Sequence, residues 1–252
     1  MEARVTHIWR HPIKGVGAEA LLSSEFVAGN TMPYDRVWAV AHEASKAPAG
    51  SSDWVHCNNF IRGAKSPGLM AVKAKMTGPE GLIELSHPDA GSITVNPGDI
   101  GDATRMVAWV TPLCDPNRAL PSHVVRAGTR GMTDSKIRSV SILNNASLAA
   151  LSKVAGRDLA QERFRGNIWL DGLEPWQEFD LLDKKLRIGG ATFVVRERIT
   201  RCTATGVDPE TGEPDTDTLR LLQENWGHRD FGVYAEVVGD GIASVNDVAV
   251  LA

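Results

Sequence analysis

A single cysteine in an arginine-rich stretch is the residue best placed to do chemistry. Cys202 lies between a strand-like run and a polar turn rich in Pro, Gly, Asp and Glu, and Arg196, Arg198 and Arg201 precede it. Nearby positive charge favours the thiolate, which is the form that attacks electrophiles and binds metals. Such a group can ligate a soft metal, act as a nucleophile or exchange electrons, and the plain alternative is a buried packing cysteine.

A second group of basic residues lies upstream of this cysteine. Arg163 and Arg165 directly precede the apolar strand candidate 168–170, and Lys14 and Arg36 stand in similar positions beside short strands. If these strand ends converge, their side chains offer bidentate donors to a phosphate. No Walker loop or Gly-rich dinucleotide fingerprint is present, so side chains and loop amides would hold the phosphate. We therefore expect one anion-binding pocket that also carries the Cys202 thiolate.

The remaining cysteines and histidines give weaker signals. Cys57 and Cys114 share no metal-finger spacing with Cys202 and are interpreted as packing residues. His7 and His11 stand four apart, but Pro12 ends the strand on which they fall, so the seven histidines are interpreted as structural.

Composition indicates a globular protein and restricts its partners. The chain has 252 residues with 27 basic and 31 acidic side chains, a formal net charge of −4. Without a basic excess or a polybasic block, neither a nucleic acid nor a membrane surface is expected as a partner. The N-terminal stretch lacks the apolar core of a signal peptide, and no apolar run approaches the ~20 residues that span a bilayer. Few cysteines and no disulfide framework favour a cytoplasmic location.

The elements that must position these residues are mainly strands. In the first part, short apolar runs between Gly and Pro breakers predict strands that form a β-barrel or sandwich. The pattern lapses over residues 112–131, where several Pro and Gly residues predict a domain boundary or a long functional loop. We place two domains at 1–112 and 113–252.

The second part contains the clearest helix. Asn144 or Asn145 can cap it, Leu148 and Leu151 supply its apolar stripe, and Gly156 follows its end. Strand candidates resume after it, and Gly189-Gly190 predicts a two-residue hairpin between two of them. The predicted fold class is mainly β, as β-barrels with a few helices.

Several motifs together resemble the MOSC superfamily, which is named after the C-terminal domain of molybdenum cofactor sulfurases. The resemblance covers nearly the whole chain and is to the long form, which includes the mitochondrial amidoxime-reducing component and its bacterial relatives. In the first part it rests on HPIKGVGAEAL, YDRVWAV and FIRGAKSPGLMAV. In the second part it rests on SILNNASLAAL, ERFRGNIWLDG, the LRIGG hairpin and RCTATGVDPETG. It implies an N-terminal MOSC-type β-barrel domain packed against a C-terminal MOSC β-barrel domain.

The resemblance also implies a cofactor and its ligands. The cofactor is the molybdenum cofactor (Mo-molybdopterin), and pyridoxal phosphate is not expected. The matching metal ligand is Cys202, and a soft thiolate suits a high-valent molybdenum already bound by sulfur. By position, the residues that correspond to the family's pterin and phosphate ligands are Lys14, Gly15, Arg36, Asn145, Ser147, Arg165, Asn167 and Arg201.

Three positions depart from the family pattern. Ile199 stands where the family often has a first cysteine of a P-C-x-R-C motif, although the ligand position itself is retained. Gly15 replaces a serine, so a hydroxyl donor to phosphate is lost and a backbone N–H is expected to substitute. Gly166 replaces a proline between Arg165 and Asn167, which loosens a loop without removing a donor.

The expected activity is reduction of N-hydroxylated or other N-oxygenated small molecules. Cys202 would anchor and tune the metal, and Asp208 or Glu210 would relay protons. Because no flavin, haem or iron–sulfur motif is visible, electrons are expected from a separate protein of the ferredoxin, flavodoxin or small cytochrome type. Two alternatives stay open. One is a carrier that stores or delivers the cofactor without turnover, and the other is a sulfur carrier in which Cys202 holds a persulfide.

Overall fold

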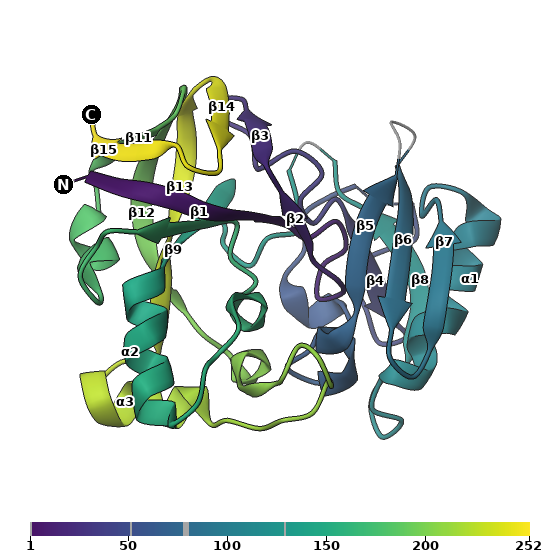
Figure 1. Ribbon diagram of the computed structural model, residues 1–252. Helices are drawn as coiled ribbons and strands as arrows, with labels where there is room; N and C mark the ends of the chain where they lie inside the picture. Colours follow the sequence, from purple (N-terminus) through teal and green to yellow (C-terminus); the bar gives the residue numbers. More distant parts are fainter. Residues whose placement is uncertain (1, 51, 78–80, 129) are drawn as a thin grey trace.

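The computed structural model describes residues 2–50, 52–77, 81–128 and 130–252, and these form two β-rich parts that lie side by side (Figure 1). Strands dominate both, and within the described ranges there are three α-helices. The prediction of a mainly β fold with a few helices is confirmed. In those same ranges, no helix is long and apolar enough to cross a membrane.

Seven strands of the second part close into a barrel. Their order is β10-β9-β13-β12-β11-β15-β1, and β1 pairs again with β10 to complete the ring. The strands are β1 Glu2–Arg10, β9 Ser139–Asn144, β10 Ile168–Asp171, β11 Lys185–Ile188, β12 Ala191–Thr200, β13 Asp230–Gly239 and β15 Val248–Leu251. Apolar side chains fill the interior, and Phe193 and Phe26 meet there edge to face with ring centroids 5.1 Å apart.

The first part is built from two small sheets around a core of its own. Strands β5 Lys73–Thr77, β6 Leu82–His87 and β7 Gly91–Val95 form an antiparallel meander. Strand β4 Trp38–His42 pairs with β8 Pro121–Arg126, and helix α1 Ile100–Val110 packs its Met106 and Val110 into the shared core. A meander and a two-stranded pair bury little alone, so their common apolar cluster stabilises this part.

Strand pairing crosses the predicted boundary between residues 112 and 113. Strand β1, at the start of the chain, lies in the barrel of the second part, and β8 lies in the first part. Two shorter strands bridge the parts: β2 Glu19–Leu21 extends the barrel sheet from β1, and β3 Ser23–Phe26 pairs with β14 Gly241–Ser244. The two parts therefore exchange strands.

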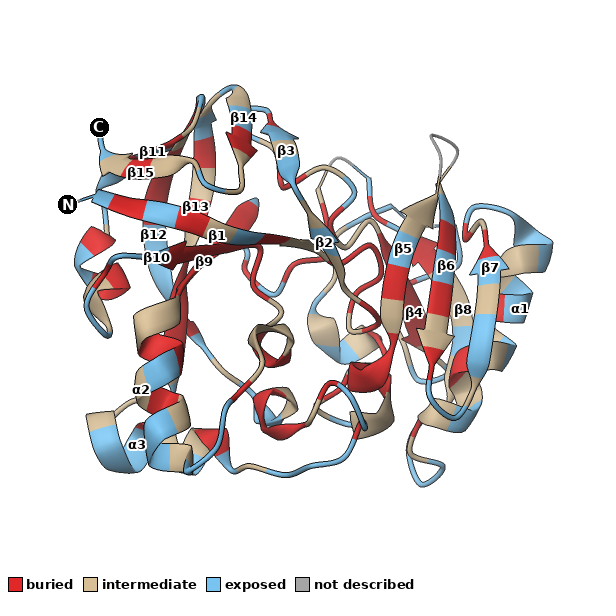
Figure 2. Ribbon diagram, viewed as in Figure 1, coloured by how far each residue is buried: buried red, intermediate tan, exposed pale blue. Residues whose placement is uncertain are grey.

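The helix and the hairpin predicted in the second part are confirmed. Helix α2 spans Asn145–Ala155, the Asn144 side chain accepts a hydrogen bond from the Ala146 N–H, and Gly156 ends the helix at φ 68°. Strands β11 and β12 join through the two glycines, with Ile188 opposite Ala191. A further helix, α3, spans Thr218–Trp226. Figure 2 shows buried residues along both α2 and the barrel strands, and the buried leucines of α2 belong to an apolar cluster separate from the barrel interior.

The elements β8, β9 and α1 were not predicted from the sequence. Strand β8 lies inside the stretch 112–131 that was interpreted as a boundary or a loop, and it begins at Pro121, a place where a strand tolerates proline. All six residues of β9 are buried. Two of them are serines, whose polar side chains interrupt the apolar pattern that would predict a buried strand. Helix α1 begins with an exposed Ile100 and contains β-branched residues, which weaken the helical signal, although Asp99 caps it.

Candidate functional site

A cavity of about 290 Å³ lies where the two parts meet, and residues of both parts line it. It contains the predicted cysteine and most of the predicted cations. Six of the predicted site residues line it: Lys14, Gly15, Arg36, Arg165, Arg201 and Cys202. The stretches around residues 163–166 and 199–205, which were expected to meet, do so here.

Cys202 stands at the point where β12 has ended and a short 3-10 helix, Thr203–Gly206, begins. Cys202 is an exposed residue with a free thiol. The Thr203 hydroxyl donates to the Ala64 carbonyl at 3.3 Å, which ties this turn to the first part of the chain. The turn therefore presents the thiol to the cavity on a segment held from both sides.

Arg165 and Arg201 are anchored by backbone carbonyls rather than by carboxylates. Arg165 donates to the carbonyls of Gly17 (2.9 Å) and Ile13 (3.3 Å). Arg201 donates to Phe231 through Nε at 2.8 Å and to Phe164 through Nη1 at 2.8 Å. Carbonyls fix the guanidinium planes without neutralising their charge.

Their pKa values report this uncompensated charge. Burial, followed by repulsion from Arg36, lowers the pKa of Arg165 to about 9. Burial also lowers the pKa of Arg201 to about 10, against the opposing attraction of Tyr234 and Cys202. A buried cation without a counterion is costly, and an anion that enters the cavity relieves that cost.

Arg36 is held in a strained conformation at the centre of the site. Its φ is 53°, in the left-handed region, and Arg165 shares this feature at φ 47°. Arg36 bonds through Nη1 to the buried carboxylate of Asp35, and through Nη2 to the Arg165 carbonyl at 2.8 Å. Two adjacent strained arginines, joined by a hydrogen bond, are typical of a pre-organised site.

Behind Arg36 lies a neutral histidine. The His11 ring is buried 3.3 Å from Asp35. Burial, and then repulsion from Arg165 and Arg36, lowers the pKa of His11 to about 3. Burial would raise the pKa of Asp35, but Arg36 and the hydrogen bonds from His11 outweigh it, and the pKa is lowered. The His11–Asp35 contact is therefore a hydrogen bond at neutral pH, and Asp35 is left to compensate Arg36.

Lys14 is buried, and its ammonium already has an ionic partner. Nζ donates to Asp134 Oδ1 at 2.6 Å and to the Met132 carbonyl at 2.6 Å. Burial lowers the pKa of Lys14, and Asp134 opposes that shift. An acidic side chain thus accompanies Lys14 in the cavity lining.

Gly15 allows its backbone to pass very close to the backbone of Ile61 and Arg62. Its φ is +73°, and a Cβ at this position would lie 2.9 Å from the Ile61 carbonyl oxygen and 3.0 Å from the Arg62 Cα. Both are backbone atoms that cannot move aside. The serine of the family pattern does not fit this backbone without a shift, so the replacement by glycine matches the local packing.

The charges in the cavity do not balance. Of its six basic side chains, three pair with carboxylates: Lys14 with Asp134, Arg36 with Asp35 and Arg163 with Asp215. The hydrogen bonds described for the other three, Arg62, Arg165 and Arg201, go to carbonyls, an amide oxygen and a thiol. The cavity is thus suited to an anion of more than one charge.

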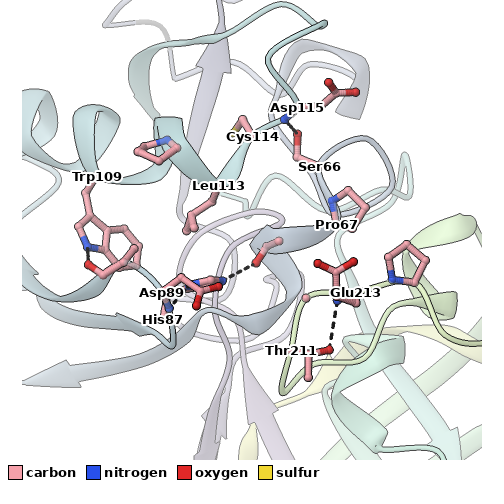
Figure 3. Close-up of a pocket in the computed structure, with 15 residues that line it drawn as sticks. Ser66, Pro67, His87, Asp89, Trp109, Leu113, Cys114, Asp115, Thr211 and Glu213 are labelled. Carbon is pink, nitrogen blue, oxygen red and sulfur yellow. Dashed lines mark hydrogen bonds between the residues drawn. The ribbon is translucent and has the colours of Figure 1, made fainter.

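A second cavity, of about 580 Å³, shows the opposite character (Figure 3). The 211–214 segment forms one side of it, and its acidic lining residues are Asp89, Asp115 and Glu213. Among the described residues that line it there is no Lys or Arg. Its thiol, Cys114, is buried and bonded to the Val110 carbonyl at 3.4 Å. This cavity offers an anion no favourable contact.

The structure places three of the predicted cofactor residues elsewhere, in internal hydrogen bonds. Asn145 donates to the Thr6 hydroxyl at 2.9 Å, and Ser147 is buried against Glu178. Asn167 accepts from the Ser141 hydroxyl at 2.8 Å and fixes β9 against β10. None of the three is among the residues that line the thiol cavity.

Three further residues of the sequence hypothesis also lie outside the cavity lining. The Asp208 carboxylate accepts from the Glu210 N–H at 2.9 Å within its own turn. Arg196 pairs with Glu236 at 2.6 Å, and Arg198 lies over the Phe179 ring at 4.2 Å. Of the three arginines before Cys202, therefore, Arg201 is the one whose side chain reaches the cavity.

The cavity also contains residues that the sequence reasoning did not single out. Cys57, interpreted as a packing residue, lines it and accepts a hydrogen bond from Arg62 at 2.9 Å. Asp134 and Tyr234 line it as well, and burial followed by Asp134 raises the pKa of Tyr234 to about 12. Of these additional residues, Arg62 is the one that lies in a motif named above, FIRGAKSPGLMAV. Among the described residues, no group of three or more His, Cys, Asp or Glu side chains forms a metal site.

Comparison with family models matches nearly the whole chain. Residues 2–112 match the MOSC N-terminal beta barrel domain, and residues 129–250 match the MOSC domain. The first match ends at the boundary that separates the two predicted domains, although β1 within it lies in the barrel of the second part.

Individual relatives match in part. A molybdenum cofactor sulfurase of Anopheles gambiae is 36% identical over 84 residues, which are 33% of this chain and 11% of that protein. The sulfurase of Caenorhabditis elegans is 36% identical over 97 residues, covering 37% of this chain and 13% of that protein. The sulfurase of Bombyx mori is 21% identical over 268 residues, covering 90% of this chain and 31% of that protein. The chain thus spans less than a third of the length of each of these relatives.

Two solved structures are similar at low identity. The YUAD protein from Bacillus subtilis covers 99% of this chain and 94% of its own, with a TM-score of 0.47 and 12% identity. YiiM from Geobacillus stearothermophilus covers 45% of this chain and 53% of its own, with a TM-score of 0.34 and 16% identity.

Proposed function

The chain belongs to the MOSC family and carries both its N-terminal barrel domain and its MOSC domain, and on this premise we propose that it is a molybdenum-cofactor-binding oxidoreductase that reduces N-hydroxylated or N-oxygenated small molecules. The observation that carries the proposal is the cavity between the two parts. There an exposed thiol, Cys202, shares one lining with three basic side chains to which the described residues give no carboxylate partner, Arg62, Arg165 and Arg201.

The residues present fit this cofactor. Its phosphate needs cationic donors whose charge is not already neutralised, and Arg165 and Arg201 supply them on fixed planes. Its metal needs one soft protein ligand that is open to the cavity, and Cys202 is such a residue. Gly15 lines the cavity next to Lys14 in the chain, and its backbone N–H is a donor suited to an anion. When bound, the molybdenum cofactor would supply two-electron reduction chemistry at this thiol.

The protein's own residues then have separate tasks. Arg201, adjacent in sequence to Cys202, places a positive charge in the same cavity lining as the sulfur. Tyr234 keeps its phenolic proton at physiological pH because its pKa is raised to about 12, mainly by burial, so it is available as a hydrogen-bond donor in the cavity. Electrons would come from a separate redox protein, and the substrate would be a small N-oxygenated molecule.

Metal analysis tests the proposal directly. The protein is expressed in a host that makes the molybdenum cofactor, purified, and its molybdenum content is measured together with reduction of benzamidoxime by a chemical electron donor. We expect about one metal per chain, lost in Cys202→Ala and retained in Cys114→Ala, whose thiol lies in the other cavity. Equal metal content in the two variants, or none in the wild type, would remove the proposal.

The named relatives favour one alternative. Curated sequences that match a third of the chain are molybdenum cofactor sulfurases, so cofactor handling without substrate reduction is the second candidate. A carrier of this kind would bind the cofactor, transfer it to an apo-enzyme and show no reduction with any electron donor. A sulfur carrier would instead show a persulfide adduct on Cys202 by mass spectrometry after incubation with a cysteine desulfurase.

A further inference from the structure

One acidic side chain, Asp134, stands among the six cations of the thiol cavity. Among the described residues that line the cavity, Asp134 is the one with an acidic side chain. It lies on the connection from β8 to β9, which joins the two parts of the chain. Its Oδ1 accepts from the Lys14 ammonium at 2.6 Å. The Lys14 side chain is 5% exposed, whereas the Asp134 side chain is 59% exposed. The pair thus joins a fixed, buried cation to a carboxylate that faces solvent.

The electrostatic influence of Asp134 reaches several other side chains of the cavity. Burial lowers the pKa values of Lys14, Arg165 and Arg201, and Asp134 opposes that shift; burial raises the pKa values of Cys57 and Tyr234, and Asp134 adds to that rise. Burial would raise the pKa of Asp134 itself, but Lys14, Arg36 and Arg62 outweigh it, and the pKa is lowered. Asp134 is therefore ionised at neutral pH and partly neutralises the cations of both parts.

The backbone around Asp134 is tied down, so the carboxylate can move without the loop. Arg130 donates to the carbonyls of Ser135 and Lys136 at 2.7 Å each. The Trp54 indole donates to the Thr133 carbonyl at 2.9 Å, and the Met132 N–H donates to the Arg36 carbonyl at 2.8 Å. A rotation of the Asp134 side chain toward solvent would take the carboxylate partner from the Lys14 ammonium, which keeps its hydrogen bond to the Met132 carbonyl, and would leave these contacts in place.

We propose that Asp134 is an internal counter-anion, which occupies Lys14 until the phosphate of an incoming phosphate monoester takes its place. A dianionic phosphate replaces one negative charge by two and also reaches Arg165 and Arg201, which Asp134 leaves without a carboxylate partner. A monoanion merely exchanges one charge for another and gains little. Asp134 thereby sets the affinity of the cavity for anions and disfavours weakly charged ones. The inference rests on the proposed function only for the identity of the molecule that carries the phosphate.

Titration of an anion into variants that have lost one carboxylate charge tests this proposal. Inorganic phosphate is titrated by calorimetry into the wild type, Asp134→Asn and Asp89→Asn. The last of these makes the same charge change in the second cavity and serves as the matched control. We expect Asp134→Asn to bind phosphate at least about fivefold more tightly than the wild type, the gain that follows from losing one competing ion pair. Asp89→Asn should bind like the wild type, and Asp134→Glu, which keeps the charge, should stay within about twofold of it.

A second pair of variants identifies the cation involved. In a Lys14→Met background, Asp134→Asn should give less than half of its gain, because the contested ammonium is gone. Circular dichroism and thermal unfolding confirm that each variant is folded.

Unchanged or weaker phosphate binding by Asp134→Asn would overturn the inference, as would phosphate binding by neither protein. Molybdenum in the wild type without a gain in Asp134→Asn defeats this inference alone. A gain in phosphate affinity without molybdenum in the wild type defeats the proposed function alone.

Discussion

At the scale of single residues, burial and hydrogen-bond partners separate side chains that look alike in the sequence. Arg165 and Arg201 are held by carbonyls and keep their charge for a ligand, whereas Arg196 is neutralised by Glu236 at the surface. Ser147 and Asn167 are polar residues with internal partners. A residue type in a motif thus indicates a possible contact, and the partner decides whether the contact remains available to a ligand.

Replacing Ser147 separates a structural role from a cofactor role. Its hydroxyl lies 2.9 Å from both oxygens of Glu178, which is fully buried and whose pKa burial raises, and it accepts from the Trp176 N–H at 2.8 Å. We expect Ser147→Ala to lower the free energy of unfolding by about 1–3 kcal/mol, because a buried carboxyl and an N–H lose their partner. Urea unfolding measures this loss.

The same variant should bind phosphate as tightly as the wild type, because Ser147 is not part of the cavity lining. Weaker phosphate binding with unchanged stability would show that Ser147 contacts the ligand after all.

At the scale of elements, short segments with unusual backbone conformations build the site. The Lys14-Gly15 turn, the Arg36 position before β4 and the Arg165 position before β10 all have a residue with positive φ. The Arg36 segment connects β3 and β4, which belong to different sheets, whereas the other two segments connect neighbouring strands of the barrel sheet, β1 with β2 and β9 with β10. The cavity is therefore shaped by connections whose ends are fixed by the strands on either side.

Replacing Gly15 measures how tightly the chain is packed at this turn. Gly15→Ala places a methyl group 2.9 Å from the Ile61 carbonyl oxygen at a φ of +73°, so we expect a loss of about 2–4 kcal/mol in the free energy of unfolding. Gly29→Ala is the matched control, since its φ is +75° and nothing lies within 4 Å of the added Cβ. It should lose about 1 kcal/mol, the cost of the left-handed conformation alone.

Denaturant unfolding of both variants gives the difference. If the two alanine variants lose the same stability, the close approach of the backbone at Gly15 is not a packing constraint.

At the scale of the whole molecule, the two parts are joined by exchanged strands. Strand β1 closes the barrel between β10 and β15, while β8, from the other side of the predicted boundary, pairs with β4. The N- and C-termini lie next to one another on the barrel, as Figure 1 shows. Since β1 precedes the first part in the chain and Lys14 follows it directly, the exchange also brings the cations of both parts to one cavity.

A truncation tests this dependence. Residues 113–252 alone lack β1, so the barrel stays open between β10 and β15 with unpaired edges, and we expect an unfolded or aggregated product. Adding residues 2–10 after Ala252 through a short Gly-Ser linker should restore a folded barrel, because Glu2 lies opposite Val250 in the antiparallel pair.

Circular dichroism and dispersed amide NMR signals report the outcome for both proteins. A cooperative fold of residues 113–252 without β1 would contradict the role assigned to that strand.

Several of the local elements and the chemical types of the site can be predicted from the sequence alone. Asn144 and Gly156 mark the ends of α2, the glycine pair marks a hairpin, and Cys202 with the arginines of two stretches indicates an anion pocket that carries a thiol. These signals are local, since capping, turn geometry and charge clustering depend on residues a few positions apart. The tertiary structure is needed to show that β1 and β8 exchange parts, that Asp134 accompanies Lys14, and that Asn145 and Ser147 lie outside the cavity lining. The physical reason is that strand pairing and ion pairing join residues more than a hundred positions apart, as Lys14 and Asp134 are, and no local pattern in the chain records such a contact.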